Sequence, residues 1–115
     1  MKNRTDLIAR ALRNLGALPQ GQSPSAEESQ SLSDLIDAMI ADLAAREITL
    51  LTIDPDAFDD QYLIPLGLTL AWAAASEFGQ DGNQNLLGLA EQAELKLKKM
   101  TSAVYTRKIA QGQYY

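Results

Sequence analysis

The sequence predicts an all-α protein, a small four-helix bundle followed by an extended C-terminal arm. Apolar residues recur at helical spacing in four segments of the 115-residue chain. Capping residues and glycines separate these segments, and the β-branched stretch at 47–53 is short. We therefore expect one domain, with residues 1–103 forming the bundle and 104–115 forming a docking arm.

The first helix is expected to begin at Thr5 and Asp6, where the threonine hydroxyl is available as a cap. Gly16 is a natural stop for this helix, and a polar loop follows at 19–24. Between start and stop, the apolar residues at helical spacing are Leu7, Ile8, Ala11, Leu12 and Leu15.

The second helix has the clearest amphipathic pattern in the chain and is expected to run from Ser25 to about Arg46. Ser25 and Glu28 have the spacing of a capping box. One face carries Leu32, Leu35, Ile36, Met39, Ile40 and Leu43, whereas Asp34, Asp37 and Asp42 fall away from it.

Residues 47–53 (EITLLTI) predict either a short strand or an extended connection, and 54–60 predict a turn. A third helix is expected over 60–78 and is apolar around most of its circumference. Such a helix is usually surrounded by others. Pro65 must lie in its first turn or kink it, and Gly79 should end it.

The fourth helix is expected over 83–103, with Glu91 and Glu94 preceding Lys96, Lys98 and Lys99, an order that suits the helix dipole. The segment after Ala103 shows no apolar stripe. It carries three tyrosines, and tyrosine and arginine are favoured anchors in protein interfaces.

Composition argues against several kinds of chemistry. The chain has no cysteine and no histidine, so it lacks thiolate ligands and the commonest general base. Asp54 and Asp56 begin like a calcium loop, but Phe58 takes the next ligand position and no glycine follows. We expect no enzyme, no cofactor and no metal site. The apolar stretch 63–75 is too short to span a membrane.

Charge is segregated along the chain, whose net charge is −5. Residues 1–13 and 95–115 are basic, whereas the middle is acidic. This pattern favours head-to-tail contact between copies or contact with oppositely charged partners. Solvated surface charge that happens to cluster explains it equally well.

Three stretches in this order resemble the phage head–tail connector (adaptor) proteins, also called head-completion or packaged-DNA-stabilisation proteins. They are residues 6–16 (DLIARALRNLG), 24–43 (PSAEESQSLSDLIDAMIADL) and 62–79 (YLIPLGLTLAWAAASEFG), followed by a helix with a regular Ala/Leu pattern. The region after the second helix is short and leaves no room for the sizeable β insertion of some members.

The resemblance implies a ring, usually of twelve copies, that binds the portal protein in the virion neck after synthesis in the host cytoplasm. Such a ring extends the DNA channel, retains packaged DNA without binding it specifically, carries the next neck, stopper or tail protein, and involves no membrane. The arm that reaches the portal would comprise Tyr105, Arg107, Lys108, Ile109, Gln113, Tyr114 and Tyr115.

An acidic channel wall would let DNA slide, because attraction to phosphate depends on basic contacts. We hypothesise that this wall includes Asp34, Asp37, Asp42, Asp54, Asp56 and Asp59. Two other functions stay open. The chain is alternatively a small acidic helical protein-interaction module, or a DNA-binding regulator that uses its basic ends.

Overall fold

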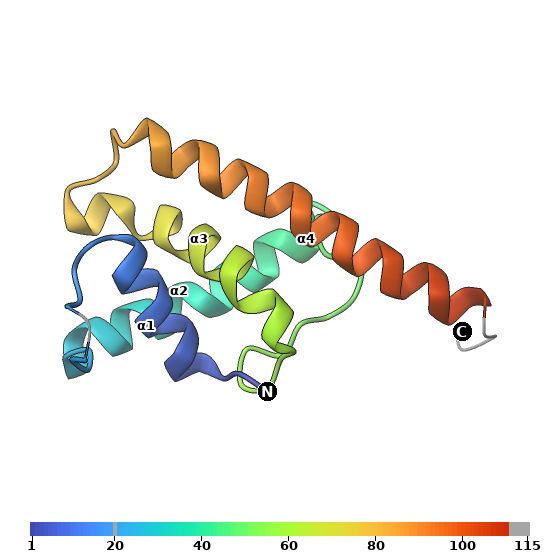
Figure 1. The fold of residues 1–115 in the computed structure, drawn as a ribbon, viewed down its shortest axis with the longest axis horizontal. Helices are drawn as coiled ribbons and strands as arrows, with labels where there is room; N and C mark the ends of the chain where they lie inside the picture. Colours follow the sequence, from blue (N-terminus) through green and yellow to red (C-terminus); the bar gives the residue numbers. More distant parts are fainter. Residues whose placement is uncertain (20, 111–115) are drawn as a thin grey trace.

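The computed structural model describes residues 1–19 and 21–110, apart from the side chains of 108–110, and within these residues it contains helices and no named strand. The all-α, four-helix prediction is confirmed. In Figure 1, α3 lies beside α4, α1 packs on α3 away from α4, and the C-terminal end of α4 projects beyond the other helices. The helices are α1 (Arg4–Asn14), α2 (Ala26–Ala45), α3 (Leu63–Ala73) and α4 (Gln84–Ala110), with the short 3₁₀ helices η1 (Asp60–Tyr62) and η2 (Ala75–Phe78).

Capping boxes begin the first two helices. In α2, the Ser25 hydroxyl accepts a hydrogen bond from the Glu28 N–H at 3.2 Å and the Glu28 carboxylate accepts one from the Ser25 N–H at 3.1 Å, as predicted. In α1 the cap is Asn3, which exchanges the same pair of bonds with Asp6. The prediction that Thr5 caps α1 is wrong, because the Asn3 amide oxygen already accepts from Asp6 and Thr5 lies inside the helix.

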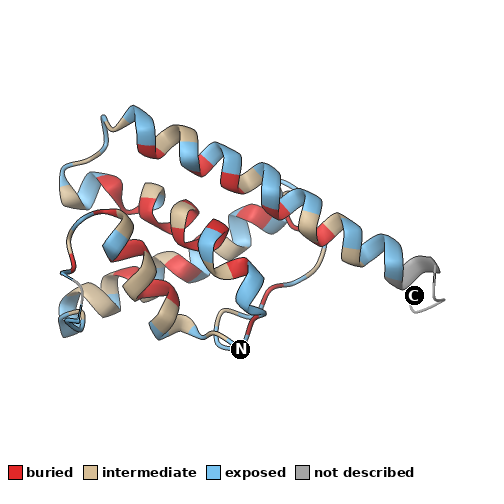
Figure 2. Cartoon of the chain, in the orientation of Figure 1, coloured by how far each residue is buried: buried red, intermediate tan, exposed pale blue. Residues whose placement is uncertain are grey.

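The core is built around α3, which contacts each of the other three helices. Leu66 and Leu70 are completely buried, and Pro65 is buried in the first turn, where a missing N–H costs no helical bond. A Cβ at Gly67 would lie 2.7 Å from Cγ of Arg10, so α1 and α3 approach closely there. Figure 2 shows buried residues distributed along α3, as expected for a surrounded helix.

The third helical segment differs from its prediction in continuity. The predicted single helix over 60–78 is divided into η1, α3 and η2. Gly79 ends it as predicted, with a φ of +71° that an L side chain rarely adopts.

The connection between α2 and η1 is irregular. Glu47 adopts φ +57° immediately after α2, and the Ile48 N–H donates to the Leu43 carbonyl at 2.9 Å, which closes the helix end. Residues 47–53 form no strand, and the alternative of an extended connection is met only in part, because the segment begins in a turn and bends at 48, 50 and 51. The nearby β pairing is an isolated antiparallel bridge, in which Lys2 and Phe58 exchange bonds of 2.9 and 3.0 Å.

The fourth helix is longer than predicted. The prediction that it ends near Ala103 is wrong, because α4 continues through Ala110. No glycine or proline stands between Gly88 and Gly112, so no strong helix breaker interrupts this stretch. The first part of the predicted arm is therefore a projecting helix, and residues 111–115 lie outside the described residues.

Candidate docking site

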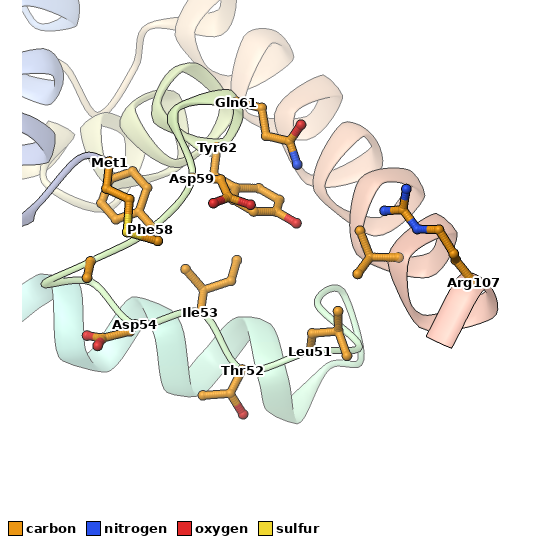
Figure 3. A pocket seen from close by; sticks show the side chains of 12 residues that line it. Met1, Leu51, Thr52, Ile53, Asp54, Phe58, Asp59, Gln61, Tyr62 and Arg107 are labelled. Atoms are coloured by element: carbon orange, nitrogen blue, oxygen red, sulfur yellow. The ribbon is translucent and has the colours of Figure 1, made fainter. Parts of the chain in front are cut away.

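One candidate docking surface lies where α4 leaves the bundle. The described chain measures 45 × 27 × 22 Å along its principal axes, and α4 runs out towards one end (Figure 1). An open cleft of about 310 Å³ lies beside this end, between residues 51–62 and the outer turns of α4. We call it the C-terminal cleft; Figure 3 shows its lining.

The floor of the C-terminal cleft is apolar and fixed. Ile53, Phe58 and Tyr62 are 6%, 3% and 8% exposed, and all three belong to the main hydrophobic core. Val104 contributes the facing wall from α4. Because core packing holds these side chains in place, the floor exists before any partner binds.

The rim of the cleft carries both signs of charge. Asp54 and Asp59 line it from the loop, and Arg107 lines it from α4, as Figure 3 shows. Met1, at 82% exposed, also lines the cleft. The accessible lining is therefore mixed, with polar and charged groups around a small apolar floor, a composition found towards the rim of protein interfaces.

Two contacts fix the walls of the cleft. The Thr101 hydroxyl is completely buried in α4, donates to the Leu97 carbonyl at 2.9 Å and accepts from the Leu50 N–H at 3.2 Å. This bond joins the connecting loop to α4 just before the helix projects. On the other side, the Lys2–Phe58 bridge ties the N-terminal segment to the loop.

Arg4 joins three parts of the chain behind the cleft. Its guanidinium donates to the Asp56 carboxylate at 3.1 Å, to Asp37 at 3.0 Å and to the Ser33 carbonyl at 3.0 Å. Hydrogen bonds to Asp56 and then Asp37 raise the pKa of Arg4 above its usual value. Sequence reasoning missed this role, because the partners lie 29 to 52 residues away along the chain.

Arg46 makes a second clamp, at the C-terminal end of α2. It donates to Asp42 at 2.7 Å and makes two bonds of 3.0 Å to the carboxylate of Glu94 on α4. These hydrogen bonds raise the pKa of Arg46, and the bond to Glu94 has the largest effect. The clamp fixes the end of α2 against the middle of α4.

The six acidic residues predicted to face a channel are distributed over several environments. Asp37 and Asp56 meet at Arg4, and Asp42 is paired with Arg46. Asp34 accepts a bond from the Gln30 amide at 3.0 Å, and Asp54 accepts one from the Asp56 N–H at 2.9 Å. Asp59 lies with Asp54 on the rim of the C-terminal cleft.

The predicted arm residues are only partly described. Tyr105 is 41% exposed on α4, and Arg107 lines the cleft. Lys108 and Ile109 belong to the helix, but their side chains lie outside the described residues, as do Gln113, Tyr114 and Tyr115 entirely. Val104 was absent from the predicted set; its spacing from Leu97 and Thr101 is the signal that would have found it.

Within the described residues, no group of three or more His, Cys, Asp or Glu side chains is placed to hold a metal ion. None of the described helices has the length and apolarity needed to cross a bilayer. Comparison of the chain with protein-family models, curated proteins and solved structures found no match in any of the three.

Proposed function

We propose that this chain is a structural adaptor in the neck of a tailed phage. Copies would form a ring, usually of twelve, beneath the portal, extend the DNA channel, retain the packaged DNA and carry the next neck, stopper or tail protein. The proposal assigns no enzymatic activity to the chain. The observation that supports it best is the projecting end of α4 with the C-terminal cleft beside it.

The projecting end supplies suitable anchors for a partner. Tyr105 is exposed and Arg107 borders the cleft, and these are the residue types that often dominate binding energy at interfaces. Helical backbone already orders this part of the arm, so a partner that binds it pays less conformational entropy. The portal protein is the partner that the resemblance to connector proteins implies for this end.

The acidic residues support a channel role unequally. Asp37 and Asp56 share the single charge of Arg4, and Asp42 shares that of Arg46 with Glu94, so each of these carboxylates repels phosphate less than an unpaired one. Asp34, Asp54 and Asp59 form no ion pair within the described residues. We therefore favour these three as the carboxylates that face passing DNA.

Electron microscopy of reconstituted particles tests the proposal. Purified protein is added to DNA-filled, portal-bearing heads of the phage that encodes the chain, prepared without it. We expect a ring of density coaxial with the portal, and no such ring on heads that lack the portal. Binding elsewhere on the head, or no binding at the portal vertex, would contradict the proposed function.

A further inference from the structure

A second apolar surface lies away from the C-terminal cleft. Between α3 and α4 the structure leaves a groove of about 170 Å³, lined in part by Ile64, Leu68 and Leu89. Ile64 is 55% exposed and Leu89 is 46% exposed, although both are large aliphatic side chains. Lys96 carries the charge among the lining residues. We call this surface the α3–α4 groove.

The connecting loop after α2 carries a complementary surface. Leu50 is 41% exposed, and its backbone N–H donates to the Thr101 hydroxyl, which anchors the backbone of this leucine to α4. Glu47 is exposed three positions before Leu50 in the same loop, and at the adjoining end of α2 the single charge of Arg46 is shared by Asp42 and Glu94, so negative charge is in excess in this part of the chain. Within the described residues, neither Glu47 nor Lys96 forms an ion pair.

These two surfaces lie on opposite sides of α4. Lys96 lines the α3–α4 groove, whereas Glu94 faces Arg46 at the end of α2. At 3.6 residues per turn, positions 94 and 96 are about 160° apart around the helix axis. Thr101, whose hydroxyl accepts the bond from the Leu50 N–H, lies about 140° from Lys96 around the same helix axis. One copy therefore cannot fill its own groove with its own Leu50.

We propose that Leu50 of one copy inserts into the α3–α4 groove of the next, with Glu47 facing Lys96. A void of about 150 Å³ is enough to hold a benzene-sized group, so the groove accommodates one leucine side chain. The contact is heterologous: each copy offers a knob on one side and a groove on the other, so copies add until the assembly closes. The inference rests on the proposed ring and gives that ring a subunit interface.

Cross-linking tests the contact directly, because the natural chain has no cysteine. Thr52→Cys places a thiol near Leu50, and Gln92→Cys places one in the groove; both positions are exposed. With a bifunctional thiol-reactive reagent, the double variant should give a ladder of dimers, trimers and larger species. A mixture of the two single variants should stop at dimers, and neither single variant alone should cross-link.

Substitutions in the double-cysteine background identify the residues responsible. Leu89→Glu and Lys96→Glu should each lower the cross-linked fraction about tenfold, which corresponds to roughly 1.4 kcal/mol of contact energy. Adding Glu47→Lys to Lys96→Glu should restore the ladder. Leu95→Glu and Lys98→Glu are matched controls, because both residues are exposed on α4 and neither lines the groove.

Each alternative result overturns the inference. No ladder, or one that Leu89→Glu leaves intact, excludes the groove as the contact. Efficient cross-linking of the Gln92→Cys variant alone indicates a two-fold contact instead of a head-to-tail one. The assay needs neither heads nor portal, so it separates the two proposals. A ladder without a ring on heads contradicts only the proposed function. A ring without a ladder contradicts only this interface.

Discussion

Residues 84–101 of α4, which we call its inner half, and residues 102–110, its outer half, have the same secondary structure and different surroundings. In the inner half, Leu86, Leu97 and Thr101 are buried against the bundle. In the outer half, Val104 is only half-buried and Tyr105 and Arg107 are exposed. A single helix thus serves folding along one part of its length and offers a surface to other molecules along the rest.

The difference arises from what stands opposite each half. The inner half packs on α3 and is clamped by Arg46 through Glu94. The outer half faces the 51–62 segment across the open C-terminal cleft. Burial of apolar area stabilises a fold in proportion to the area removed from water, so the inner half should carry most of the stability.

Removing a core side chain from the inner half gives the largest expected effect. Leu97→Ala should lower the free energy of unfolding by about 2–5 kcal/mol, because Leu97 is completely buried. Tyr105→Ala in the outer half should change it by less than about 0.5 kcal/mol. Urea denaturation followed by circular dichroism measures both, and equal losses would mean that the two halves do not differ in this way.

The junction between the halves is expected to be next in size. Thr101→Val keeps the shape of the side chain but leaves the Leu50 N–H without its acceptor, which should cost about 1–3 kcal/mol. Thr101→Ser retains the hydroxyl and is the matched control for the bond. If Thr101→Val unfolds at the same urea concentration as the unchanged protein, the bond does not hold the loop to α4.

The Arg46 clamp should contribute least, because its groups are partly exposed. A double-mutant cycle with Arg46→Met and Glu94→Gln should give a coupling energy of about 0.2–1 kcal/mol. The coupling should shrink as salt is added, since exposed charges are screened. A coupling that is large and insensitive to salt would show that the clamp is a buried interaction instead.

Local signals in the sequence predicted much of the fold. The Ser25–Glu28 capping box and the stop at Gly79 depend on residues a few positions apart, so the sequence alone identifies them. The apolar residues around most of the circumference of α3 predicted that other helices surround it. The predicted end of α4 was wrong because the apolar stripe stops after Ala103 where the helix leaves the bundle. The helix itself continues.

The candidate site was less accessible to prediction. Tyr105 and Arg107 were identified as residue types suited to binding, and the structure places them on the projecting helix. The C-terminal cleft and the Arg4 junction depend on contacts between distant segments, such as the 52 positions that separate Arg4 from Asp56. No local pattern marks such contacts, so only the folded chain reveals them.

One measurement tests most directly whether the outer end of α4 serves attachment and not folding. A chain lacking residues 107–115 is compared with the full chain in urea denaturation and in binding to portal-bearing, DNA-filled heads. We predict the same unfolding midpoint for both chains and loss of binding by the shortened one. Undiminished binding of the shortened chain, or its failure to fold, would contradict the division of α4 described above.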